Sequence, residues 1–154
     1  SIAFASSKTP AKPTDATRTW TNIKPGDRLS GLTVKLAQGA ASLRGQIALG
    51  EDETLPDGLF MYLIPAEREK ADDVLRYFTA PVTPDGKMAL NNVAPGRYWI
   101  LAQPAVRESS SQLTQIRMPD ATEMRARLRK NAEAKKTEIE FKPCQSVVDF
   151  RLKL

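Results

Sequence analysis

The chain has 154 residues, a formal net charge of +5 and no histidine. This length fits one domain with appendages, and no apolar run reaches the roughly 20 residues that a membrane-spanning helix needs. Without histidine, a Ser-His-Asp triad, a Cys-His pair and an imidazole metal site are all excluded. Lysine, carboxylate and tyrosine chemistry survive this exclusion, but we expect a non-catalytic protein with no metal site and no cofactor.

Residues 1–30 are predicted to form an extended N-terminal arm or linker. Residues 1–19 are rich in Ser, Thr, Ala, Pro and Lys, and apart from Ile2 and Phe4 they offer almost nothing to bury. Such a composition is typical of an extended linker. A segment so poor in apolar residues rarely orders itself, so we expect the arm to lie along a neighbouring subunit.

Residues 31–154 are predicted to form a β-sandwich domain. Residues 33–37 make a short first strand, and residues 42–49 alternate between apolar and polar side chains, as a half-buried strand does. The positions expected on the inner face of this second strand are Leu43, Gly45, Ile47 and Leu49. Residues 59–64 are apolar on both faces and precede Pro65, which is typical of a central strand covered on both sides.

Further strands are predicted at residues 74–82, 88–90 and 97–102. Between the first two, residues 83–87 read Thr-Pro-Asp-Gly-Lys, a sequence that favours a tight hairpin turn. In the third strand, three residues are expected to share one side: Tyr98, Ile100 and Ala102.

A single helix is predicted as an insertion at about residues 120–136, where Asp120 and Glu123 have the spacing of a capping box. Its apolar stripe is narrow, so we expect it to dock shallowly or against a partner. The stripe consists of Ala121, Met124, Leu128 and Ala132. Strands follow at residues 137–141 and 147–154, and the last one is expected to turn four side chains to the core: Val148, Phe150, Leu152 and Leu154. Short strands with one late helix predict a mainly β, antiparallel sandwich.

Several short motifs in this β region carry a family resemblance. Residues 44–47 read RGQI, residues 56–63 read PDGLFMYL, residues 85–90 read DGKMAL and residues 92–98 read NVAPGRY. In this order they resemble the carboxypeptidase regulatory-like family, with Met88 in place of its usual aromatic residue. The resemblance implies a transthyretin-like (prealbumin-type), Ig-like sandwich, found as an accessory module of secreted or surface proteins, and it brings no catalytic residues.

Six residues are predicted to contact a partner: Trp20, Trp99, Arg125, Arg127, Arg129 and Lys130. The basic residues lie on the predicted helix and form either a solvated helix face or a contact for an acidic protein patch. Nucleic acid is disfavoured because no aromatic side chains interleave with them. Trp20 and Trp99 are either interfacial aromatic residues or a cover over the second sandwich face. We expect Arg125→Glu with Arg129→Glu to weaken association and leave thermal stability nearly unchanged.

The single cysteine, Cys144, excludes an internal disulfide, and we predict that it is a small buried hydrophobic residue near a strand start. Together the features predict a structural or protein-interaction module in an extracytoplasmic assembly, after removal of a signal peptide. Other protein subunits are the expected partners. The alternative is a carbohydrate- or polymer-binding module, in which Trp99 would present its ring to a polysaccharide.

Overall fold

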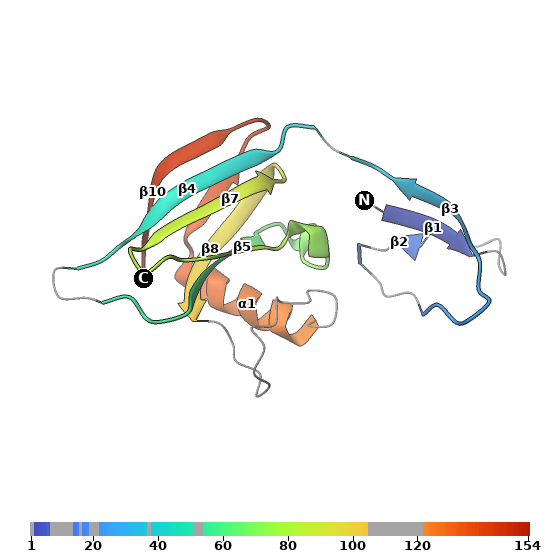
Figure 1. The fold of residues 1–154 in the computed structure, drawn as a ribbon, viewed down its shortest axis with the longest axis horizontal. Coiled ribbons are helices and arrows are strands. Elements are labelled where there is room, and N and C mark those ends of the chain that lie inside the picture. The colour runs from blue at the N-terminus through green and yellow to red at the C-terminus, as the bar shows by residue number, and fades with distance from the viewer. Residues whose placement is uncertain are drawn as a thin grey trace.

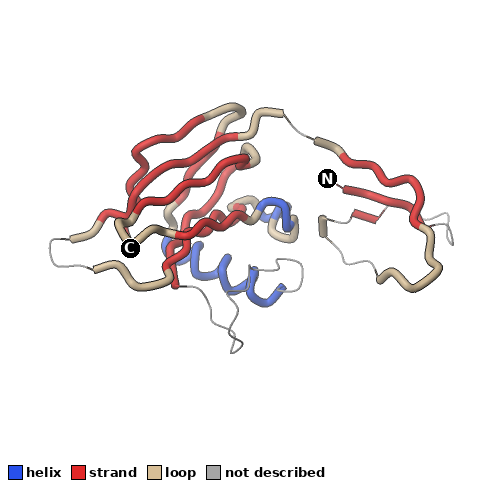
Figure 2. The backbone as a smooth tube through the Cα atoms, in the orientation of Figure 1, coloured by secondary structure: helices blue, strands red, loops and turns tan. Residues whose placement is uncertain are grey.

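The computed structural model describes residues 2–6, 14–15, 17–18, 22–36, 38–50, 54–104 and 122–154. These ranges form a β-sandwich with one α-helix on its outer face and a separate sheet near the N-terminus (Figures 1 and 2). The helices are η1 (Arg68–Lys70), η2 (Val74–Arg76) and α1 (Thr122–Lys135). The strands are β1 (Ile2–Ser6), β2 (Thr14–Asp15), β3 (Leu29–Val34), β4 (Ala41–Ala48), β5 (Leu59–Pro65), β6 (Phe78–Pro81), β7 (Lys87–Val93), β8 (Gly96–Pro104), β9 (Glu138–Phe141) and β10 (Ser146–Lys153).

The sandwich consists of a three-stranded sheet in the order β10-β4-β7 and a four-stranded sheet in the order β6-β5-β8-β9. The prediction of a mainly β sandwich with one helix near the C-terminus is confirmed. The antiparallel pairing predicted for the sandwich does not extend to one pair, because β10 runs parallel to β4. The other sandwich pairs are antiparallel.

The core lies between the two sheets and follows the predicted alternation in most strands. Its buried members are Ala41, Leu43, Ile47, Leu59, Met61, Leu63, Ala80, Met88, Leu90, Val93, Tyr98, Ile100, Phe141 and Leu152. The inner positions predicted in the strand at residues 97–102 are thereby confirmed, since Ala102 packs against the same cluster. Leu49 was expected inside but is exposed, because β4 ends at Ala48.

β5 is the central strand that its sequence predicts. It pairs with β6 on one side and with β8 on the other. Met61 and Leu63 face the core between the sheets, whereas Tyr62 and Ile64 belong to a second buried cluster on the opposite face. A strand that is buried on both faces has a continuous run of apolar residues, and for this reason β5 could be predicted from the sequence.

The predicted strand at residues 74–82 begins later than expected. Val74–Arg76 forms the 3₁₀ helix η2, and β6 starts only at Phe78. Asp73 caps η2, since its Oδ1 accepts a hydrogen bond from the Leu75 N–H at 3.1 Å. An Asp side chain that bonds the backbone two residues ahead favours such a turn over an extended strand.

The turn predicted at residues 83–87 is present, but it connects two sheets instead of closing a hairpin. Gly86 N donates to the Thr83 carbonyl at 2.8 Å, and Thr83 N donates to the Lys87 carbonyl at 2.9 Å. β6 and β7 nevertheless belong to different sheets. The local turn chemistry is therefore correct, whereas the pairing inferred from it is wrong.

Within this turn, Asp85 is expected to titrate far below an ordinary aspartate. Lys87 Nζ lies 2.6 Å from its carboxylate and the Thr83 hydroxyl donates to it, and these contacts lower the pKa of Asp85 to about 2. Because the pKa falls on folding, the turn's contribution to stability is present above about pH 4 and is lost as the pH falls through about 2. A carboxyl-carbon NMR titration should give this midpoint, and Lys87→Ala should move it upward. A midpoint near 3.9 in the unmodified protein would contradict the contact.

Tyr98 fixes the crossover from β7 to β8. Its hydroxyl donates to the Ala94 carbonyl at 2.8 Å, four residues upstream, and accepts from Arg76 Nη1 at 3.1 Å. The ring makes edge contacts with Phe78 and Phe141 at 5.9 Å between centroids. Burial raises the pKa of Tyr98, although Arg76 opposes this. This hydrogen bond ties a tyrosine near the start of β8 to the corner that precedes the strand.

β10 contains a bulge that changes which residues face the core. The register with β4 shifts between Val147 and Phe150, and Asp149 adopts a φ of 57°. Val147 packs against the core before the bulge, and Phe150 and Leu152 do so after it. The prediction that Val148 and Leu154 share the inner face is wrong, and both are exposed: the bulge turns Val148 away from the core, and Leu154 lies beyond the end of β10. One extra residue in a strand reverses its alternation.

The N-terminal strands form a sheet of their own, in the order β2-β1-β3 (Figure 1). β1 pairs antiparallel with both neighbours. The strand predicted at residues 33–37 is displaced, since β3 covers Leu29–Val34. It pairs with β1 instead of joining the sandwich, so the boundary predicted between residues 30 and 31 falls inside β3.

Candidate interaction surface

The N-terminal sheet is attached to the sandwich by a short turn around Thr17. The Thr17 side chain is buried, and its carbonyl accepts a hydrogen bond from Val74 N at 3.1 Å. Arg18 Nη2 donates to the Glu69 carbonyl at 3.2 Å. These contacts place the turn against the segment that contains η1 and η2.

Asp15 gives this turn its shape. Its Oδ1 accepts hydrogen bonds from Thr17 Oγ1 at 2.7 Å and from Thr17 N at 3.0 Å, and the Asp15 carbonyl accepts one from Arg18 N. The hydroxyl bond and then the backbone bond lower the pKa of Asp15. The sequence Asp-Ala-Thr-Arg thus has a local reason to turn, which the composition of the arm concealed.

Beyond the turn, β3 and the residues that flank it display large aliphatic side chains to solvent. Eight large hydrophobic side chains are exposed in the described residues, and four of them lie between residues 23 and 36. Their exposed fractions are 59% for Ile23, 67% for Leu32, 52% for Val34 and 91% for Leu36. We call Leu32, Val34 and Leu36 the aliphatic row, because they occupy alternate positions along β3 and its continuation. Clustered exposed apolar residues mark interaction surfaces.

The N-terminal segment also carries most of the net charge. Residues 1–38 contain six of the 23 basic residues and two of the 18 acidic ones, so they account for +4 of the total +5. Residues 39–154 are close to neutral, with 17 basic and 16 acidic residues. Uneven charge of this kind points to an electrostatic partner for the N-terminal segment.

Helix α1 covers the outer face of the four-stranded sheet (Figure 1). Leu128 and Ala132 are buried there in a cluster with Tyr62, Ile64, Tyr77 and Leu101. Met124 also packs against the cluster. Ala121 and Asp120 lie outside the described residues. The narrow apolar stripe therefore docks on the chain's own sheet.

Arg129 belongs to this internal interface, and Arg125 is a buried residue of the same helix. Arg129 donates to the carbonyls of Pro65 and Ala66, the latter at 3.0 Å. Its guanidinium carbon lies 4.8 Å from the centre of the Trp99 ring, which is half-buried. Arg125 is buried and donates to Thr122 Oγ1 at 3.3 Å. Arg129 and Trp99 therefore serve the helix–sheet interface, and the side chain of Arg125 is buried within the chain.

The sequence does contain a pattern that indicates the position of these arginines on the inner face of α1. Arg125, Leu128, Arg129 and Ala132 have the i, i+3, i+4, i+7 spacing of one helix face. A long arginine stem covers apolar surface while its guanidinium reaches polar atoms, so an arginine can occupy such a face. Of the other candidates, Arg127 and Lys130 are exposed on α1, and Trp20 lies outside the described residues.

Cys144 is exposed, contrary to the prediction that it is buried. It occupies the turn between β9 and β10 with a φ of 60°, and its N–H donates to the Gly39 carbonyl at 2.9 Å.

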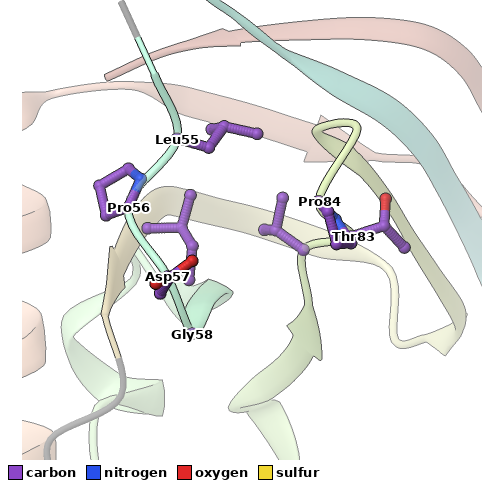
Figure 3. A pocket seen from close by; sticks show the side chains of 8 residues that line it. Leu55, Pro56, Asp57, Gly58, Thr83 and Pro84 are labelled. Atoms are coloured by element: carbon purple, nitrogen blue, oxygen red, sulfur yellow. The ribbon is translucent and has the colours of Figure 1, made fainter.

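A small hollow lies where the segment before β5 faces the turn after β6 (Figure 3). Leu55, Pro56 and Asp57 line one side, and Thr83 and Pro84 line the other. Its volume of about 120 Å³ is below the roughly 300–1,000 Å³ typical of small-molecule sites. Within the described ranges, no group of three or more Cys, Asp or Glu side chains could hold a metal ion.

Comparisons with protein-family models, curated proteins and solved structures find no match to this chain. Among the described residues, no helix is long and apolar enough to cross a membrane. The resemblance to the carboxypeptidase regulatory-like family stays a prediction.

Proposed function

We propose that this protein is a non-catalytic structural or interaction module, used as a subunit or accessory domain of an extracytoplasmic assembly. In this proposal the sandwich is the rigid body and the N-terminal sheet is the contact with a partner. The observation that carries the proposal is the aliphatic row, which is exposed on a sheet that the chain holds out from its core.

The energetics of small sheets support this proposal. A three-stranded sheet gains independent stability only when an apolar face is covered. In the N-terminal sheet, Leu32 and Val34 are more than half exposed. The sheet is fastened to the sandwich through Thr17 and Arg18, outside the row, so the row stays accessible to another molecule.

The proposal extends to the kind of module. We propose a transthyretin-like sandwich related to the carboxypeptidase regulatory-like family, a type that serves secreted and surface proteins. The turn at residues 83–87, the buried Met88 and Leu90 and the corner made by Tyr98 support this kinship, since these are the residues of the motif. A polysaccharide site has less support, because Arg129 covers the ring of Trp99.

The test is an affinity capture from the source cells with three tagged proteins. The wild type and the control Val148→Ser are expected to retain the same stoichiometric partners, whereas Leu32→Ser/Val34→Ser is expected to lose them. Val148 is a matched control, because it is an aliphatic strand residue that is 60% exposed, on the sandwich instead of the N-terminal sheet. All three proteins should melt within a few degrees of one another, since exposed substitutions cost about 0.5 kcal/mol or less. Partner retention by the double variant would refute the proposed contact.

A further inference from the structure

We propose that the partner of the N-terminal sheet is an acidic protein segment that adds as a β-strand to the open edge of β3. This inference rests on the function proposed above and specifies the chemistry and geometry of its contact. Three observations carry it: an unpaired strand edge, an alternating apolar row and an excess of positive charge in the same segment.

The first observation is the edge itself. β3 lies at the end of the order β2-β1-β3, and within the described residues only β1 pairs with it. The backbone N–H and C=O groups on its outer side are therefore available for a further strand. Strand addition uses such main-chain groups for affinity and alternate side chains for specificity.

The second observation is the spacing of the row. Leu32 and Val34 are two residues apart on one strand, and Leu36 continues the spacing beyond it. Alternate residues of an extended chain point to one side. A partner strand paired with β3 would bring its own alternate side chains beside this row, as cross-strand neighbours do. The matching partner therefore has apolar residues at every second position.

The third observation is charge. Lys24, Arg28 and Lys35 are exposed around the row, in a segment with a net charge of +4. An acidic strand would meet complementary potential there, and a basic strand would be repelled. Because the remainder of the chain has a net charge near zero, this preference is confined to the N-terminal segment.

The experiment measures binding of two labelled peptides of about eight residues, a common strand length. One alternates valine with glutamate and the other alternates valine with lysine. Fluorescence anisotropy with the full chain should show the glutamate peptide binding at least about tenfold more tightly. Its affinity should fall as salt rises from about 0.05 to 0.5 M, because salt screens exposed charges. Amide exchange at residues 32–36 should slow in the complex.

Variants and alternative probes decide the outcome. Leu32→Ser/Val34→Ser should abolish binding of the glutamate peptide, and Val148→Ser should leave it unchanged. Equal binding of both peptides, or no binding of either, would overturn the inference. So would binding to anionic phosphatidylserine vesicles in place of peptide, or a dimer of the wild type that the double variant lacks. If the captured partners still depend on Leu32 and Val34 while the peptides fail, the proposed function stands and only this inference fails.

Discussion

Gly45→Ala is expected to destabilise the sandwich by about 3 kcal/mol or more, a large part of the roughly 5–15 kcal/mol that holds a domain folded. A Cβ at position 45 would lie 2.3 Å from the Phe150 carbonyl oxygen and 3.0 Å from its carbonyl carbon. These are backbone atoms of β10, so no side-chain rotation relieves the clash. The parallel pair β4–β10 must separate at its bulge. Denaturant titration followed by circular dichroism would measure the loss.

The control for this variant is Arg44→Ala on the same strand. Arg44 is exposed, so its truncation should change the free energy of unfolding by no more than about 0.5 kcal/mol. If Gly45→Ala were as mild as Arg44→Ala, β10 could not approach β4 as closely as the structure has it.

Arg129→Glu is expected to cost about 2–4 kcal/mol and to lower the Tm by several degrees. The change removes two hydrogen bonds to carbonyls and the contact with Trp99, and it directs a carboxylate at the Pro65 and Ala66 oxygens. The sequence-based expectation that glutamate here leaves stability nearly unchanged is therefore replaced. In a Trp20→Phe background, the fluorescence of Trp99 should shift to longer wavelength as its ring becomes exposed.

Arg127→Glu is the matched comparison, with the same change of charge two residues away. Arg127 is exposed on α1, so we expect a change of about 0.5 kcal/mol or less and unaltered Trp99 emission. Equal losses in the two variants would mean that Arg129 does not hold the helix on the sheet.

Much of the sandwich could be predicted because its signals are local. The apolar run of β5, the alternation in β8 and the turn residues around Gly86 each encode their own conformation. The predictions that were wrong concern strand pairing, which depends on residues distant in the sequence. The parallel direction of β10 and the sheet change at the turn are decided by the arrangement of whole strands, which no local window contains.

The candidate site was predicted less well, for two physical reasons. The basic residues of α1 are predicted from the sequence to face solvent or a partner, but an arginine stem can be buried while its guanidinium donates to carbonyl groups, as in Arg129. The N-terminal arm was judged by its poverty in apolar residues. The structure of this segment depends instead on the turn made by Asp15 and on backbone pairing between β1 and β3. Backbone pairing leaves little trace in the pattern of apolar side chains.

The pairing of β4 with β10 also determines when the molecule can fold. The hydroxyls of Ser42 and Ser146 meet at 3.1 Å although 104 residues separate them. Closing so long a loop is entropically costly, and folds dominated by such contacts form in about milliseconds to seconds. During synthesis β4 must wait, with one edge unpaired, until β10 has left the ribosome. We therefore expect a sandwich that closes only after translation of β10, with its greatest exposure to aggregation just before that moment.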